Sequence, residues 1–207
     1  MWPEKKNICG LLLAGGQSRR MGGGDKCLTT LGDKTLLQRL ADTAGPQVGP
    51  LVLNTNSDPA LFGSYNLPVA PDVVDGFAGP LAGVLTGLEW AGVNAPHCDW
   101  VASFACDAPF VPVNLVARLI ESVAEDGADM ACAASGGRDH PVFALWPVRL
   151  AGVLRAAVVD EGLRKVDIWT ARFKLARAEF DVGNGDPFFN INRPEDIDAA
   201  AVLMIDD

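Results

Sequence analysis

The sequence contains no continuous apolar stretch of ~20 residues, the length that a membrane-spanning helix needs, so we expect no membrane association. Basic residues are scarce, because 17 Lys and Arg stand against 26 Asp and Glu and leave a formal net charge of −9. A chain with this balance has no basic stripe that would displace counterions from a nucleic acid, so we expect no nucleic-acid partner. A small polyphosphate, by contrast, needs only a local basic loop.

Cysteine and histidine are too few and too scattered for a structural zinc site. The five cysteines have no C-x-x-C spacing, and His97 and His140 are the only histidines. Three of the cysteines lie in apolar runs, as reduced core residues of cytosolic proteins do. The basic start of the chain resembles a signal peptide, but its apolar run contains Gly10 and ends at Arg19-Arg20 without a cleavage site. We therefore expect a cytoplasmic protein.

The stretch Leu11–Lys26, LLLAGGQSRRMGGGDK, continues an apolar strand into a loop rich in glycine and cations. Glycine lacks Cβ, so the backbone N–H groups of Gly15 and Gly16 can approach an anion closely. Arg20 and Lys26 can neutralise that anion. The spacing fits neither the P-loop nor the dinucleotide G-x-G-x-x-G motif. The loop predicts a phosphate site, and the alternative is a glycine-rich turn with solvated charges.

Apolar runs of strand length alternate with segments of helical periodicity over the first half of the chain. The predicted strands are Ile8–Leu13, Leu51–Thr55, Pro68–Ala70 and Trp100–Cys106. The predicted helices are Thr35–Ala44, Gly79–Gly92 and a third that starts at Pro112. This alternation indicates an α/β fold with a mainly parallel sheet, right-handed crossovers and helices on both faces. A length of 207 residues fits a single Rossmann-like domain over 1–207.

The second half of the chain is less regular. Two strands, Met130–Ala134 and Val142–Trp146, are expected to pair around Gly136-Gly137. The remaining predicted elements are a helix over Val148–Val159, a strand over Lys174–Phe180 and a C-terminal helix from Pro194 to about Ile205.

Polar side chains follow several of the predicted strands. Asn54, Asp72 and Asp107 all fall at carboxyl ends of strands, where open α/β sheets bind their ligands. Asp107 is suited to Mg²⁺, which takes one or two carboxylates together with substrate phosphates, although a turn or helix cap explains it equally well. Asn54 and Asp72 by themselves are equally consistent with ordinary turn residues.

The same residues carry a resemblance to a known family. Leu13-Ala14-Gly15-Gly16, Arg20-Met21-Gly22 and Asp25-Lys26 are similar to the signature of the MobA-like nucleotidyltransferases. The resemblance continues through Asn54, Pro71-Asp72, Gly79–Gly83, Cys106–Pro109, Arg138–Pro141 and Asn190–Asn192. It implies a nucleotide-diphospho-sugar-transferase-like fold. It also implies transfer of GMP from GTP to the terminal phosphate of molybdenum cofactor (Mo-molybdopterin), with release of pyrophosphate.

The resemblance also implies roles for individual residues. Lys26, Asp107 and Arg20 are expected to be catalytic, with Asp107 holding Mg²⁺. The expected GTP-binding residues are Leu13, Ala14, Gly15, Gly16, Lys26, Asn54, Asp72 and Asp107. Residues 1–125 would form the nucleotide-binding half and 126–207 the acceptor-binding half. Proteins that supply and receive the cofactor are the expected partners.

The acceptor site is the least explicit in the sequence. The alternation Asn190-Ile191-Asn192 would place two amides on one face of an extended segment, where they suit a pterin ring. The basic pair Arg164-Lys165 suits the acceptor's phosphate. The alternatives are a capping residue at Asn192 and an exposed charge pair at Arg164-Lys165.

Neither Cys106 nor His140 looks like a nucleophile, and the expected reaction does not need one. A phosphate monoester has a second pKa near ~6 and is largely a dianion at neutral pH. Two other functions stay open: a related transferase that uses CTP or a sugar or lipid phosphate, and a non-catalytic carrier that binds nucleotide or cofactor.

Overall fold

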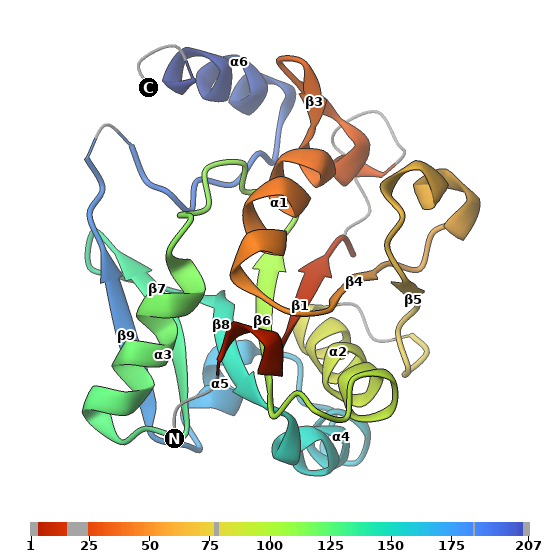
Figure 1. The fold of residues 1–207 in the computed structure, drawn as a ribbon, viewed down its shortest axis with the longest axis vertical. Helices are drawn as coiled ribbons and strands as arrows, with labels where there is room; N and C mark the ends of the chain where they lie inside the picture. Colours follow the sequence, from red (N-terminus) through yellow and green to blue (C-terminus); the bar gives the residue numbers. More distant parts are fainter. Residues whose placement is uncertain (1–3, 16–24, 77–78, 184, 205–207) are drawn as a thin grey trace.

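The structure is a computed structural model that describes residues 4–15, 25–76, 79–183 and 185–204. A seven-stranded sheet in the order β5-β4-β1-β6-β8-β7-β9 runs through its centre (Figure 1). β1 lies between β4 and β6 and pairs in parallel with both. The strands of this sheet are β1 (Ile8–Leu13), β4 (Leu51–Asn54), β5 (Val69–Ala70), β6 (Trp100–Ala105), β7 (Met130–Ser135), β8 (Arg138–Pro147) and β9 (Leu175–Phe180).

The sheet is mainly parallel, as predicted, and β8 is the exception. β8 runs antiparallel to β6 and to β7, whereas the other neighbouring strands pair in parallel. The expected hairpin between β7 and β8 is confirmed. Gly136 and Gly137 turn it with φ angles of +53° and +74°, in the left-handed region that glycine adopts without strain.

Helices cover both faces of the sheet, as the alternating pattern predicted (Figure 1). Side chains of successive β1 residues point to opposite faces. Ile8 and Leu12 therefore pack with α1 and α3, while Cys9 and Leu11 pack with α2, α4 and α5. The helices are α1 (Leu36–Ala44), α2 (Pro80–Asn94), α3 (Leu115–Asp126), α4 (Ala151–Val159), α5 (Val166–Thr170) and α6 (Pro194–Leu203). None of the helices in the described ranges has the length and apolar character needed to cross a membrane.

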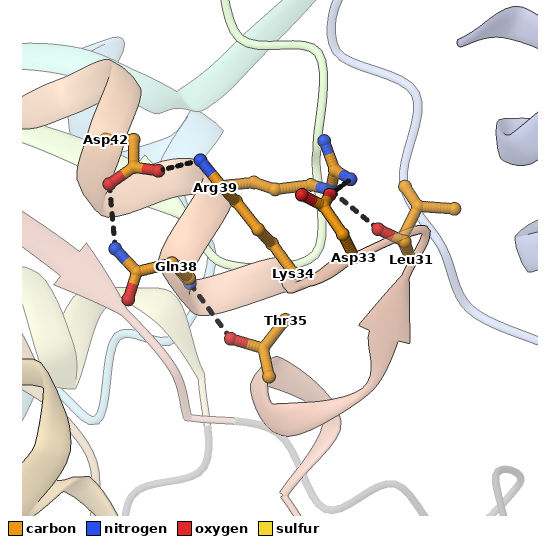
Figure 2. Close-up of polar contacts among 7 residues, drawn as sticks. All are labelled: Leu31, Asp33, Lys34, Thr35, Gln38, Arg39 and Asp42. Carbon is orange, nitrogen blue, oxygen red and sulfur yellow. Dashed lines mark hydrogen bonds and ion pairs between the residues drawn. The ribbon is translucent and has the colours of Figure 1, made fainter. Parts of the chain in front are cut away.

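A small hairpin precedes α1 and was not predicted, because its strands are too short to show a period. Thr35 caps α1 by accepting a hydrogen bond from the Gln38 N–H at 3.1 Å (Figure 2). Arg39 reaches back from the helix and donates to the Leu31 carbonyl at 2.8 Å, which ties the hairpin to α1. The hairpin strands are β2 (Thr30–Leu31) and β3 (Lys34–Thr35).

Several predicted helix boundaries are wrong. α2 continues past Gly92, because Gly92 does not adopt the left-handed conformation of a terminal glycine. α3 begins at Leu115 rather than at Pro112, whose carbonyl accepts the Leu115 N–H in a preceding turn. The predicted helix over Val148–Val159 begins with a 3₁₀ turn, and α5 was not predicted. The 3₁₀ helices are Lys5–Asn7, Lys26–Leu28, Gly45–Gln47, Pro59–Tyr65 and Val148–Leu150.

α6 lies beside the β2–β3 hairpin, at the end of the sheet where β1 and β6 terminate (Figure 1). Its first turn is closed by Asp196, whose carboxylate accepts the backbone N–H groups of Asn192 and Arg193 at 2.7 and 2.8 Å. Ile191 is fully buried against Leu31. This packing holds residues 190–192 over the carboxyl end of β6.

Candidate active site

A cavity of about 1010 Å³ lies at the carboxyl ends of β1, β4 and β6. Its walls come from both halves of the chain, so segments that are distant in sequence face one space. The predicted residues that line it are Leu13, Ala14, Gly15, Lys26, Asn54, Asp72, Asp107, Asn190 and Asn192. The structure therefore brings the predicted nucleotide residues and the predicted acceptor asparagines together.

Four other predicted residues are placed differently or not described. Gly16 and Arg20 lie outside the described residues. Arg164 and Lys165 are exposed just before α5 and do not belong to the cavity lining. The Arg164 carbonyl oxygen lies near Gly79, which does line the cavity, at 3.8 Å from the point where a Cβ on that glycine would stand. The basic pair is thus at the margin of the cavity, and its role in acceptor binding stays a prediction.

Lys26 connects three segments at the centre of the cavity. Its Nζ donates to Asp107 Oδ2 at 2.8 Å and to Asn192 Oδ1 at 2.9 Å. The backbone adds a further link, because the Ile191 N–H donates to the Asp107 carbonyl at 2.8 Å. The Lys26 and Asp107 side chains are 16% and 30% exposed, so both remain accessible to a ligand in the cavity.

Asn54 and Asp72 form a second polar group beside the first. The Asn54 amide nitrogen donates to the Ala70 carbonyl at 3.1 Å and to Asp72 Oδ1 at 2.9 Å, which uses both of its hydrogens. Asn56 donates to the other Asp72 oxygen at 2.9 Å. On its remaining side Asn54 Oδ1 faces α2, where a Cβ on Gly83 would lie 2.5 Å from it. Glycine at this position allows α2 to pack directly against the amide.

One wall of the cavity was not assigned from the sequence. It is formed by a bulge in β8, where the register with β7 shifts between Cys132 and Ala133. Residues 141–143 lie within this shift and have no partner on β7. Pro141 was the available signal, because proline inside a strand marks an edge or a bulge. The bulge and the paired residues before it contribute Arg138, Asp139, His140, Pro141, Val142 and Phe143 to the lining.

His140 is held in this wall by polar partners. Its Nε2 lies 2.7 Å from Ser135 Oγ, which in turn donates to Asp186 Oδ1 at 2.8 Å. The imidazole also packs on the Phe188 ring, with the ring centroids 4.6 Å apart. Burial lowers the pKa of His140, and the nearby Asp186 carboxylate offsets this only in part.

The lining suits a metal ion that is shared with a substrate. In the described part of the chain, no group of three or more His, Cys, Asp or Glu side chains is arranged to hold a metal by itself. Asp107 offers one partly exposed carboxylate on the cavity wall, with its Oδ2 in contact with Lys26. Mg²⁺ is commonly bound by one or two carboxylates plus substrate phosphates and water. Asp107 therefore fits a Mg²⁺ ion that arrives with a nucleoside triphosphate.

Cysteine does not supply a nucleophile here. All five cysteines are buried and free. Burial raises the pKa of Cys27 to about 12 and raises that of Cys106 well above its ordinary value. Both thiols line the cavity but stay protonated at neutral pH, and a protonated thiol is a poor nucleophile.

The chain is similar to known proteins over nearly its whole length. Residues 10–173 match the MobA-like NTP transferase domain. The chain is 52% identical to the molybdenum cofactor guanylyltransferase of Bradyrhizobium sp. (strain ORS 278), over 95% of this chain and 92% of that one. It is 49% identical to the protein of the same name from Rhodopseudomonas palustris (strain BisB5), over 95% and 94% of the two chains.

A solved structure shows the same fold. It is molybdopterin-guanine dinucleotide biosynthesis protein A from Archaeoglobus fulgidus, with a TM-score of 0.75 and 22% sequence identity. The similarity covers 96% of this chain and all of that one. The predicted α/β architecture is thereby confirmed.

Proposed function

Because the chain belongs to the MobA-like NTP transferase family, we propose that it transfers GMP from GTP to the terminal phosphate of molybdenum cofactor. The products are molybdopterin guanine dinucleotide and pyrophosphate. The structural observation that supports this reaction is the cavity itself. It brings a lysine, a carboxylate and the end of a glycine loop together with the amides of Asn190 and Asn192.

The reaction requires positioning and charge neutralisation more than proton transfer. An oxygen of the acceptor's phosphate dianion attacks the α-phosphorus of GTP, and the bond from that phosphorus to the pyrophosphate oxygen breaks. The Lys26 ammonium and the backbone of Gly15 stabilise the charge that develops on the phosphates. Asp107 would hold Mg²⁺ with the substrate phosphates, and the ion supplies further charge neutralisation when bound.

The guanosine is proposed to bind where β1 and β4 end. Leu13 and Ala14 are fixed there, because the Leu13 carbonyl accepts the Cys106 N–H and the Ala14 N–H donates to the Asn54 carbonyl. A rigid backbone edge of this kind reads a base well, since a wrong base leaves its polar groups unpaired. Asp72, held by two amides, would contact the ribose or base beside Asn54.

The acceptor is proposed to bind on Asn190 and Asn192, on the wall that the C-terminal segment contributes, with Arg164 and Lys165 at the margin. Proteins that supply and receive the cofactor are proposed as partners. We also propose a cytoplasmic location, which is supported by five free and buried cysteines.

The proposal is tested by measuring pyrophosphate release from GTP with Mg²⁺ and molybdenum cofactor, each left out in turn. We expect release only when all are present. Asp107→Ala and Asp107→Asn should abolish it with the fold intact, while Glu89→Gln should not, because Glu89 pairs with Arg155 away from the cavity. Faster turnover with CTP would favour the related transferase. Tight binding without any pyrophosphate release would favour the carrier.

A further inference from the structure

The proton on Ser135 determines which nitrogen of His140 carries hydrogen. Ser135 Oγ has one hydrogen and lies 2.8 Å from Asp186 Oδ1 and 2.7 Å from His140 Nε2. An ionised carboxylate only accepts hydrogen bonds, so the hydroxyl hydrogen points to Asp186. The contact with His140 then requires Nε2 to be the donor. The neutral imidazole therefore carries its proton on Nε2 and a lone pair on Nδ1.

Nδ1 is the imidazole nitrogen of His140 that is left to meet a ligand in the cavity. Among the described residues, no fully buried side-chain nitrogen or oxygen lacks a hydrogen-bond partner. The polar contacts of the His140 side chain within the described ranges both involve Nε2. Nδ1 is therefore not fully buried, and the space that His140 lines is the cavity.

The surroundings keep the ring fixed and neutral. Phe188 packs on it, and the Asp186 carboxylate also accepts the Phe188 N–H at 2.9 Å, so the partners of the ring are themselves held. Burial lowers the pKa of His140, and this effect outweighs the neighbouring carboxylates of Asp186 and Asp139. Near neutral pH the wall thus presents one oriented hydrogen-bond acceptor to the cavity that Asn190 also lines.

We propose that His140 Nδ1 accepts a hydrogen bond from a ring or amino N–H of the acceptor's heterocycle, and so helps to select that substrate. Ser135 and Asp186 are positioning residues, because they act through the tautomer of His140. A pterin carries such N–H donors, whereas the phosphate of a simple sugar or lipid acceptor does not. The proposal rests on the proposed function, since it concerns that reaction's second substrate.

Two substitutions separate the nitrogens. In His140→Gln the amide reaches the former position of Nε2 and can keep the contact with Ser135, but nothing replaces Nδ1. In His140→Asn the shorter amide places its oxygen near the former position of Nδ1. We expect His140→Gln to weaken binding of Mo-molybdopterin about tenfold, the scale of one unpaired polar group. His140→Asn should recover most of that loss.

Anaerobic calorimetric titrations with Mo-molybdopterin and with GTP decide the matter, with thermal unfolding as the check on folding. The dissociation constant for GTP should change by less than about twofold in both variants. Ser135→Ala should also weaken Mo-molybdopterin binding, but by less, because the imidazole can then take either tautomer. Wild-type affinity for Mo-molybdopterin in His140→Gln overturns the proposal. An equal loss of affinity for both ligands would show that His140 has a structural role and would overturn the proposal too. So would an equal loss of Mo-molybdopterin affinity in His140→Gln and His140→Asn.

Failure of the proposed function gives a different result. In that case the wild-type protein releases no pyrophosphate from GTP and Mo-molybdopterin. If it still binds Mo-molybdopterin, the titrations of the His140 variants still test whether His140 contacts this ligand. If it does not bind Mo-molybdopterin, both proposals are wrong.

Discussion

Lys26 shows how a single side chain serves both the fold and the proposed chemistry. Within the protein it pairs with Asp107 and donates to Asn192, so its charge is already compensated. Both partners lie on the cavity wall, and the ion pair is partly exposed. A bound triphosphate would therefore compete with Asp107 for the ammonium. The net gain from Lys26 depends on how much more strongly it binds the charge that develops during transfer.

Lys26→Ala should lower turnover by about 10²–10³, the scale for losing one preorganised group that stabilises developing charge. Initial rates of pyrophosphate release at saturating GTP measure the effect. Lys34→Ala is the matched control, because Lys34 is an exposed lysine that pairs with Asp42 of α1 (Figure 2). A change in the KM for GTP alone would mean that Lys26 binds ground state and transition state equally.

The lowered pKa of His140 predicts that the stability of the protein depends on pH. Burial holds its pKa below the ordinary value of 6.5, although Asp186 and Asp139 raise it and Arg138 lowers it further. Between the lowered pKa and 6.5 the unfolded chain binds more protons than the folded protein. The free energy of unfolding should therefore fall as the pH drops through this interval.

Urea unfolding of the wild-type protein and of His140→Asn, at a series of pH values from about 7 to 5, tests this prediction. The difference in unfolding free energy should shrink toward low pH, because the variant has no imidazole to protonate. A difference that stays constant or grows would contradict the assignment. Taking the difference between the two proteins removes the contribution of the carboxylates to the pH dependence, because the carboxylates titrate in both.

At the scale of secondary-structure elements, α2 contains one glycine that close packing requires and another that it does not. Gly83 faces the sheet, and a Cβ there would lie 2.5 Å from both Asn54 Oδ1 and Leu13 Cδ2. Gly92 lies nearer the end of the helix, and the nearest atom to a Cβ there is Val148 Cγ1 at 3.9 Å, an ordinary contact. The first glycine sets the distance between α2 and the nucleotide site, and the second does not.

Gly83→Ala should destabilise the protein by about 1–3 kcal/mol, the usual cost of overpacking, and should weaken GTP binding by displacing Asn54. Gly92→Ala should instead stabilise it by about 1 kcal/mol, because alanine is the better helix former. Urea unfolding and GTP titration of both variants provide the measurements. Wild-type GTP affinity in Gly83→Ala would show that the site does not depend on this close approach.

At the scale of the whole molecule, the cavity depends on the return of the chain's last segment to the first loop. Asn192 contacts Lys26 across 166 positions of sequence, and Ile191 bonds to the backbone of Asp107. The C-terminal segment thus closes one side of a site whose other side is built by β1, β4 and β6. Nucleotide and acceptor are expected to occupy neighbouring parts of this one space, which meet at Lys26 and Asn192.

Asn190→Ala and Asn192→Ala should therefore weaken Mo-molybdopterin binding several-fold while GTP affinity stays unchanged. Calorimetric titration with each ligand in turn measures both constants. Asn114→Ala is a suitable control, since Asn114 lies before α3 and outside the cavity lining. Equal losses for both ligands, or for neither, would mean that these amides serve the fold; for Asn192, a loss of both would point to its bond with Lys26.

The sequence by itself determined those features that depend on local signals. The apolar run at Ile8–Leu13, the Gly79-Pro80 helix start and the alternation of strands and helices predicted the parallel part of the sheet. In such a sheet the carboxyl ends of the strands meet at one edge, so residues after them share a site. For that reason the sequence alone groups Lys26, Asn54, Asp72 and Asp107, with the family resemblance supplying their roles.

Only the tertiary structure decided which side chains complete that site. The antiparallel insertion of β8, its bulge at Pro141 and the short helix α5 follow from pairing and packing between distant segments, which no local period records. Arg164-Lys165 has the right charge for a phosphate but lies just before α5, at the margin of the cavity. His140 lies in the stretch Arg138–Pro141 that carries the family resemblance, but no role follows for it from the sequence, because its partner Asp186 lies 46 positions away and is linked to it through Ser135. Hydrogen-bond partners of this kind exist only after the chain has folded.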